Sequence, residues 1–265
     1  MRSGDTVIFS FDEFRDETVA PFKEALDYAA ENGVKNFVID LTTNSGGSSE
    51  TLVYMLDMIG GDSATYIYNE STGNVLEGNY LVDRNLDGEF DEADDDVRYE
   101  LNFAILTSRN SYSAANLLPC YAKEQGITVI GERSGGGTCA LSVQAFPDSM
   151  MYALSGADKL TYKNGEDVDG GVDPDVVLVE NNDFSALFDI ERINEAISGT
   201  RPAPSTKNDL PETKPETDPS NNGGTEVYVD RSVISGDTAT VIALAVLGAA
   251  ALGAIAVIII SKKRS

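Results

Sequence analysis

The sequence predicts an α/β domain with a largely parallel sheet, followed by an extended stalk and one transmembrane helix. Three observations carry this prediction. Through residues 1–199, apolar segments typical of buried strands alternate with helical stripes of apolar side chains, as in domains whose parallel strands are joined by helices. Five of the nine prolines then fall within residues 200–237. Residues 240–260 carry no charge at all.

The first elements of the domain follow from these patterns. Short apolar runs predict strands at residues 6–11, 36–41, 103–107 and 128–131. The stripe formed by Phe22, Leu26 and Ala29 predicts a helix. That helix should end before Gly33, because glycine readily adopts the left-handed conformation that follows many helices.

Three further helices complete the expected domain. Apolar spacing predicts one over residues 52–59, which ends at a pair of glycines. Another should follow Ser113, where Pro119 is expected to kink the helix or delay its start, because proline lacks an N–H group. A last helix over residues 184–197 is expected to close the core.

Residues 200–237 are expected to form an extended extracellular stalk. Pro, Thr, Glu, Asp and Asn dominate this stretch, so it cannot bury enough apolar surface to fold. Within it, residues 210–214 (Leu-Pro-Glu-Thr-Lys) resemble a sortase signal, with lysine where glycine is required. This resemblance is a hint of a Gram-positive bacterial surface.

The uncharged run from Thr240 to Ile260 is twenty-one residues long. At about 1.5 Å per residue, a helix of this length spans the roughly 30 Å hydrocarbon core of a bilayer. We therefore expect a transmembrane helix over residues 238–260 and, as a second partner, the lipid bilayer. The basic tail, residues 261–265, should be cytoplasmic by the positive-inside rule, which places the domain outside the cell.

An external domain needs an export signal, yet the residues after Met1 lead directly into a strand pattern. We therefore expect that the chain lacks an N-terminal part. The alternative is a tail-anchored protein with its domain in the cytosol.

Composition excludes several classes of protein. A net charge of -25 repels phosphate backbones, so nucleic-acid binding is not expected. Two cysteines, Cys120 and Cys139, are too few for a disulfide scaffold. Because the chain contains no histidine, it cannot by itself build a Ser-His-Asp triad or an imidazole metal site.

Two loops, each between a predicted strand and a predicted helix, can carry chemistry. The first ends in Gly46 and Gly47, and N–H groups of glycines near a helix start are suited to an oxyanion hole. The second presents Ser113 before small residues that permit a tight turn. Taken singly, the first loop is equally compatible with an ordinary glycine turn, and Ser113 with a helix N-cap.

Together, the loops resemble motifs of the tail-specific, or C-terminal processing, serine protease family. The family's pattern (I)DLRxNxGG is similar to Ile-Asp-Leu-Thr-Thr-Asn-Ser-Gly-Gly at residues 39–47. Its nucleophile motif resembles Ser-Ala-Ala-Asn at 113–116, its V-I/V-G-E motif resembles residues 129–136, and its closing E-G-x-G-V-x-P-D resembles residues 169–175. The resemblance covers about residues 5–198 and implies a peptidase-like catalytic core over residues 1–199. It also implies a ClpP/crotonase-like fold with repeated β-β-α units.

The resemblance implies a role for five residues. Ser113 would be the nucleophile, and the N–H groups of Gly46, Gly47 and Ala114 would form the oxyanion hole. Asp169 would stand where the tricorn-type branch has a glutamate that orients the catalytic apparatus.

The chain departs from the family at the general base. Processing proteases carry a lysine within a Gly-Lys-Gly motif that here reads as three glycines, residues 135–137. The triple glycine is similar to the branch of tricorn core proteases and interphotoreceptor retinoid-binding protein, in which tricorn proteases use an upstream histidine as base. Asn116 also replaces the usual glutamate. Because a serine without a base loses on the order of 10⁶ in turnover, we expect the 265-residue chain alone to be nearly inactive.

A separate acidic loop predicts a structural calcium site. Residues 83–94 fit the EF-hand pattern D-x-[DN]-x-[DN]-G, flanked here by expected strands at 78–82 and 97–101. The oxygen ligands would come from Asp83, Asn85, Asp87, the Glu89 carbonyl and Asp94. An acidic solvated turn is the alternative.

These observations favour a serine-type endopeptidase that hydrolyses peptide bonds at the cell surface, with polypeptides as substrate. The absent base keeps open a catalytically inactive, peptide-binding surface domain of the same fold. A third possibility is an unrelated hydrolase or isomerase, because fold alone does not fix chemistry.

Overall fold

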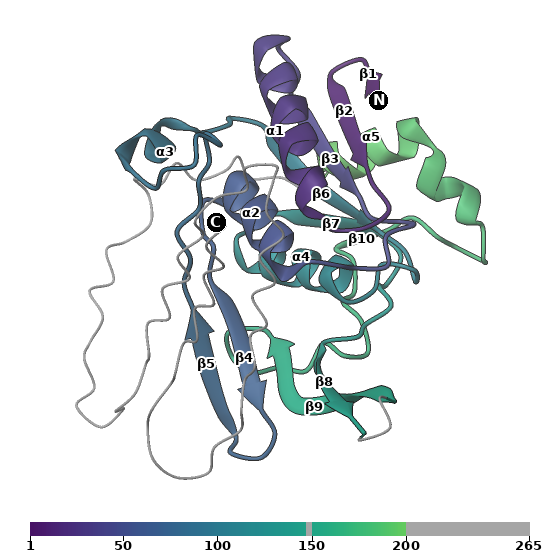
Figure 1. Ribbon diagram of the computed structural model, residues 1–265. Coiled ribbons are helices and arrows are strands. Elements are labelled where there is room, and N and C mark those ends of the chain that lie inside the picture. The colour runs from purple at the N-terminus through teal and green to yellow at the C-terminus, as the bar shows by residue number, and fades with distance from the viewer. Residues whose placement is uncertain (147–149, 200–265) are drawn as a thin grey trace. The chain divides into compact units, whose positions relative to one another are not determined.

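The computed structural model describes residues 1–146 and 150–199 (Figure 1). The expected stalk (200–237), transmembrane helix (238–260) and basic tail (261–265) all lie outside the described residues. Within the part of the chain that is described, no helix is both long enough and apolar enough to cross a membrane.

A six-stranded sheet forms the centre of the domain (Figure 1). Its order is β1-β2-β3-β6-β7-β10. The strands are β1 (Arg2–Ser3), β2 (Thr6–Ser10), β3 (Asn36–Asp40), β6 (Asn102–Thr107), β7 (Thr128–Gly131) and β10 (Val176–Val177). Every neighbouring pair runs parallel except β1 with β2. The prediction of a largely parallel sheet is therefore confirmed, with all four expected strands in place.

Helices connect these parallel strands. α1 (Asp16–Glu31) joins β2 to β3, α2 (Ser49–Gly60) follows β3, and α4 (Ala114–Glu124) joins β6 to β7. The Ser48 hydroxyl caps α2 by accepting a hydrogen bond from the Thr51 N–H, and Gly61 ends the helix in the left-handed conformation.

Pro119 lies inside α4 and does not delay its start, so of the two effects expected of this proline only the kink stays a prediction. The start is fixed upstream, where the Ser113 carbonyl accepts hydrogen bonds from the N–H groups of Asn116 and Leu117.

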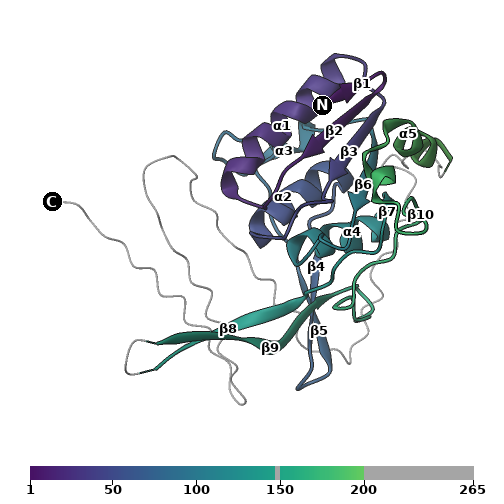
Figure 2. The same cartoon turned by 90° about the vertical axis from the view of Figure 1, so that its right-hand side faces the viewer.

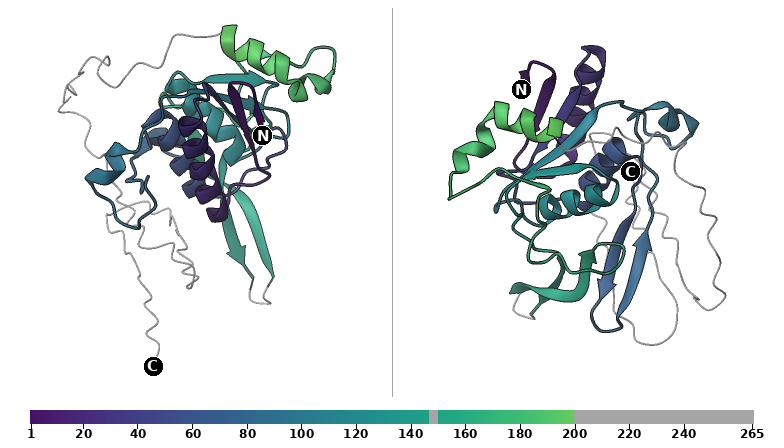
Figure 3. Two further views of the ribbon diagram at one scale, coloured as in Figure 1. Left: turned by 90° about the horizontal axis from the view of Figure 1, so that it is seen from above. Right: turned by 180° about the vertical axis from the view of Figure 1, so that it is seen from behind.

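Helices cover both faces of the sheet. On β3, Phe37 and Ile39 pack with α1, α2 and α4, whereas Val38 points to the opposite face. That face is covered by the 3-10 helix η1 (Phe184–Phe188) and by α5 (Ile190–Gly199), as Figure 3 shows. This alternation follows from the two-residue period of a strand, and full coverage explains why the central strands are apolar throughout.

The last helical segment differs from the prediction of one helix over residues 184–197. The chain forms η1 and α5 instead, with a break at Asp189. The Asp189 carboxylate accepts hydrogen bonds from the N–H groups of Glu191 and Arg192, so it begins a new helix rather than continuing the old one.

A second, antiparallel sheet lies outside the main one (Figure 2). Its order is β5-β4-β9-β8, and the strands are β4 (Thr65–Asn69), β5 (Asn74–Gly78), β8 (Cys139–Ala145) and β9 (Met151–Thr161). The short helix α3 (Glu92–Asp96) follows β5.

The implied repeat of β-β-α units holds only in part. The order β-β-α occurs at β1-β2-α1 and at β4-β5-α3, whereas β3 and β6 are each followed directly by a helix. The strands expected at 78–82 and 97–101 are also absent, because β5 ends at Gly78 and Val97 is the C-cap of α3.

Candidate active site

The two loops singled out from the sequence lie side by side, because they leave the carboxyl ends of the neighbouring parallel strands β3 and β6. The Ser108 hydroxyl donates to the Thr42 carbonyl at 2.7 Å, and the Ser111 hydroxyl donates to the Leu41 carbonyl at 2.7 Å. Both serine side chains are buried. These hydrogen bonds join the two loops into one rigid unit.

Ser113 stands at the turn between the second loop and α4. Its φ of 57° and ψ of -119° are unusual for a residue other than glycine. Its N–H donates to the Gly136 carbonyl at 2.8 Å, which holds the turn in place. The side chain is partly exposed. Ser113 occupies the N-cap position of α4, but its hydroxyl makes no capping hydrogen bond, so the N-cap interpretation does not account for this serine.

Gly46 packs directly against the Ser113 turn. A methyl group built on Gly46 would lie 2.7 Å from Ser113 Cβ and 2.7 Å from the Tyr112 carbonyl oxygen. At Gly47, such a methyl group would lie 2.3 Å from the Phe14 carbonyl oxygen. Both glycines also have positive φ, so no other residue fits here without displacing the backbone.

The N–H groups around Ser113 divide into occupied and available donors. The Gly46 N–H donates to the Asn44 side-chain oxygen at 2.9 Å, so it is already engaged within its own loop. The N–H groups of Gly47 and Ala114 have no acceptor among the described residues. For Ala114 this is expected, because it is the first residue of α4. The Gly46 N–H, one of the three donors that the sequence predicted, is therefore engaged, and the N–H groups of Gly47 and Ala114 remain candidates for the oxyanion hole.

Asp169 accepts hydrogen bonds from the end of the glycine loop, residues 135–137, and from the residue that follows it. Its carboxylate accepts a hydrogen bond from the Thr138 N–H at 2.8 Å, and its carbonyl accepts one from the Gly137 N–H at 3.2 Å. No hydrogen bond between Asp169 and Ser113 is present in the described part of the chain. Asp169 thus holds the glycine loop whose Gly136 carbonyl fixes the Ser113 backbone.

A buried hydrogen-bond network that the sequence motifs did not predict holds the N-terminal part of α4. The Ser134 hydroxyl donates to the Asn116 side-chain oxygen at 2.5 Å and accepts from the Val172 N–H at 2.7 Å. The Asn116 amide donates to the Val168 carbonyl at 3.0 Å. Asn116 and Ser134 are both buried. Asn116 stands where the family motif has a glutamate, which is a signal in the sequence, whereas Ser134 lies among charged and glycine residues that do not mark it.

In the described part of the chain, the Ser113 hydroxyl makes no hydrogen bond to an acidic or basic side chain. The hydrogen bond that Lys159 donates to the Glu70 carboxylate raises the pKa of Lys159 above its usual value, so this lysine stays protonated. Burial, and then the neighbouring Asp169 carboxylate, raise the pKa of the Cys139 thiol, which therefore stays neutral near pH 7. The Tyr112 ring lies over Gly137, where a built methyl group would be 2.2 Å from its Cζ atom.

The predicted calcium loop is closed by its own hydrogen bonds. The Asp83 carboxylate accepts from the Gly88 N–H at 2.8 Å, and the Asn85 side-chain oxygen accepts from the Asp87 N–H at 2.8 Å. The buried Asp94 carboxylate accepts from the N–H of Arg84 at 2.7 Å.

Glu89 lies exposed in the same loop. No group of three or more acidic or cysteine side chains in the described ranges is arranged to hold a metal ion. A calcium ion there stays a prediction.

A buried ion pair holds this loop on the domain instead. The Arg84 guanidinium binds both carboxylate oxygens of Asp57 on α2, one of them at 3.0 Å, and both side chains are almost fully buried. The same guanidinium contacts Asp95 at 3.2 Å. The loop is therefore anchored by an arginine that the sequence did not single out.

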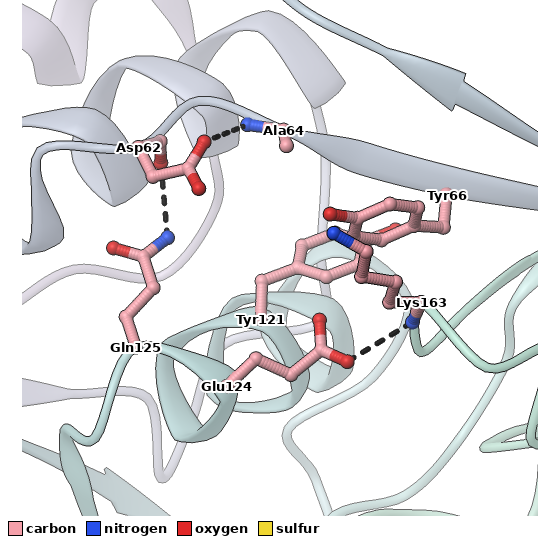
Figure 4. Close-up of a pocket in the computed structure, with 7 residues that line it drawn as sticks. All are labelled: Asp62, Ala64, Tyr66, Tyr121, Glu124, Gln125 and Lys163. Atoms are coloured by element: carbon pink, nitrogen blue, oxygen red, sulfur yellow. Dashed lines mark hydrogen bonds between the residues drawn. The ribbon is translucent and has the colours of Figure 1, made fainter. Parts of the chain in front are cut away.

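A cavity of about 360 Å³ lies at the other end of α4 from Ser113 (Figure 4). The residues that line it come from α4, from β4 and its approach, and from the turn after β9: Asp62, Ala64, Tyr66, Tyr121, Glu124, Gln125 and Lys163. None of the residues around Ser113 contributes to it.

A family model and a curated relative both match this chain. The family model "Peptidase family S41" matches residues 6–178, more than half of the chain. The "Probable CtpA-like serine protease" of Staphylococcus saprophyticus is 24% identical over 180 residues, which are 68% of this chain and 35% of that protein. The chain thus spans about a third of the length of this relative.

Solved structures show the same fold. The photosystem II D1 C-terminal processing protease matches with a TM-score of 0.54 and 22% identity, covering 69% of this chain and 45% of that one. A lipoprotein from Streptococcus agalactiae matches with a TM-score of 0.51 and 15% identity, covering 76% of this chain and 68% of that one.

The contact between Gly46 and Ser113 can be tested with two matched substitutions. Gly46→Ala adds a methyl group that has no room, which should cost about 1–3 kcal/mol of stability beyond backbone strain. Gly61→Ala, also at positive φ but with nothing within 4 Å, should cost only the strain, about 1 kcal/mol. Urea unfolding measures both, and equal losses would contradict the contact.

The anchor of the acidic loop can be tested in the same way. Arg84→Met leaves Asp57 buried without a partner and should cost about 3–5 kcal/mol in urea unfolding. Arg98→Met removes an exposed ion pair with Asp95 and should cost less than about 1 kcal/mol.

The predicted calcium site can be tested by thermal unfolding: millimolar calcium should raise the melting temperature, and Asp87→Ala should abolish this rise. If calcium leaves the melting temperature unchanged, that site is wrong.

Proposed function

The chain belongs to peptidase family S41, and from that premise we propose that it is the core of a serine-type endopeptidase acting on polypeptides at the cell surface. The observation that carries the proposal is the contact between the Gly46 loop and the strained, partly exposed Ser113 turn. The loops that carry Gly47 and Ser113 both leave the carboxyl ends of β3 and β6, and the proposed donors there are the N–H groups of Gly47 and Ala114.

The proposed reaction is acyl transfer through Ser113. The Ser113 Oγ attacks the carbonyl carbon of a peptide bond, and the oxygen of that carbonyl becomes negatively charged. The N–H groups of Gly47 and Ala114 are placed to donate hydrogen bonds to this oxygen. The amine then leaves with a proton, and water releases the peptide from the serine. Asp169 and the Asn116–Ser134 network hold the surrounding loops in position during these steps.

The proton of the Ser113 hydroxyl must pass to a base. Lys159 is held protonated by Glu70, and the Cys139 thiol is held neutral, so neither accepts it near pH 7. The proposal therefore places the base on a part of the protein outside the described residues. The chain spans 35% of the staphylococcal relative, so that protein is considerably longer.

The second candidate is a catalytically inactive domain that binds peptides on the cell surface. One observation favours it: on Gly136, the middle glycine that stands where processing proteases carry the lysine, a methyl group would lie 1.8 Å from the Asp169 carbonyl oxygen, so the backbone leaves no room for a base there. The two candidates share the fold and the oxyanion donors. They differ only in whether any base reaches the hydroxyl.

A fluorophosphonate probe separates the two candidates. In a form of the protein that includes the proposed base, we expect the probe to label Ser113. Labelling should be lost in Ser113→Ala and kept in Ser71→Ala, which changes an exposed serine in the turn between β4 and β5. The 265-residue chain alone should hydrolyse peptides about 10⁶-fold more slowly, since oxyanion stabilisation remains without a base. Normal turnover by this chain would show that it contains its own base, and no labelling of the longer protein would favour the inactive domain.

The cell-surface location rests on the uncharged run of residues 240–260 and the basic tail after it. When expressed in a bacterium, the full chain should remain in membranes washed with alkaline carbonate. A chain that ends at residue 237 should be released into the supernatant. Recovery of both chains in the supernatant would contradict a transmembrane helix.

A further inference from the structure

The hairpin of β8 and β9, which Figure 2 shows extending from the domain, exposes apolar side chains on both of its faces. On one face, Leu141 and Met151 are each 69% exposed. On the other, Leu154 is 57% exposed and Phe146 is 51% exposed, stacked 5.1 Å from Tyr152. Exposed apolar groups gathered in one element mark an interaction surface.

The hairpin is also almost uncharged in a strongly acidic chain. Residues 138–157 include a single charged residue, Asp148, whereas 24% of all residues are charged. Strands at the edge of a sheet are normally protected by charged side chains or proline, because their unpaired backbone groups can bind another strand. β8 has neither kind of residue between Cys139 and Ala145.

The backbone of β8 is open on one side. β8 is the last strand of its sheet, and among the described strands only β9 pairs with it. The Phe146 N–H donates to the Met150 carbonyl at 2.8 Å, which sets the alternation of hydrogen bonds along the hairpin. By that alternation, the N–H groups of Val143 and Ala145 face away from β9 and toward the open edge.

The open strand begins at the candidate active site. The Gly136 carbonyl that fixes Ser113 lies three residues before β8, and the Thr138 N–H is held by Asp169. A polypeptide added along β8 therefore extends from the surroundings of Ser113.

We propose that the β8 edge binds the polypeptide substrate as an added strand, with a preference for extended segments that are apolar and uncharged. Main-chain hydrogen bonds would supply affinity, and the uncharged hairpin would select the segment, because a charge buried there would have no partner. This inference rests on the proposed function, which makes the substrate a polypeptide. A second copy of the chain is the competing occupant, and it is distinguished below.

The test uses the full 265-residue chain carrying Ser113→Ala, so that binding is measured without hydrolysis. The probe is a fluorescein-labelled peptide of alternating valine and threonine, followed by fluorescence anisotropy. Val143→Pro removes an N–H that faces the open edge, a position where edge strands tolerate proline, and should weaken binding about tenfold or more. Val143→Ala keeps the N–H and should change affinity by less than about threefold.

A second probe keeps the test independent of folding. The same peptide with N-methylated valines cannot donate to an edge strand, and it should bind unaltered protein much more weakly than the parent peptide. Equal binding of the two peptides, or equal affinity of folded Val143→Pro and Val143→Ala, would overturn the proposal. So would a dimer in light scattering that Val143→Pro dissociates, if the peptide does not bind. Failure of the probe to label Ser113 would instead contradict catalysis alone, since this binding is measured without the serine.

Discussion

The close approach of Gly46 to the Ser113 turn is the constraint on which the rest of the site depends. It exists because β3 and β6 are parallel neighbours, so the loops that leave them emerge at the same edge of the sheet. The space between the two backbones admits no side chain. Ser113 adopts a positive φ under this constraint, and the strain is held by the hydrogen bond from the Ser113 N–H to the Gly136 carbonyl and by those between the two loops.

Buried hydroxyl and amide groups make this arrangement rigid. Ser108 and Ser111 bind the carbonyls of the first loop, while Asn116 and Ser134 tie α4 to the residues around Asp169. Each of these groups has its partner, which matters because an unsatisfied polar group in the core costs about 1–3 kcal/mol. In the proposed site, this network holds the loops that carry Gly47 and Ala114, whose N–H groups would stabilise a negative charge without rearrangement.

Charge is distributed unevenly over this acidic chain. The acidic loop after β5 is held by a single buried guanidinium, Arg84, which neutralises Asp57 inside the domain. The β8–β9 hairpin, in contrast, is nearly free of charge although it is exposed. An acidic surface keeps the domain soluble, whereas an uncharged edge strand invites pairing. The surface that we propose for binding a polypeptide therefore begins close to Ser113, the proposed nucleophile.

Local patterns in the sequence determined the elements and the chemistry-bearing loops. The apolar stripe of α1 and the short apolar strands need only neighbouring residues, and Gly46, Gly47 and Ser113 were found because their motifs are short and ordered. What the tertiary structure decided depends on partners far apart in the chain. The Ser111 hydroxyl binds the Leu41 carbonyl, the Arg84 side chain reaches Asp57 on α2, and β8 is left at an open edge. The spacing of residues in the sequence does not predict such long-range contacts, because they form only when the folded chain brings these groups together.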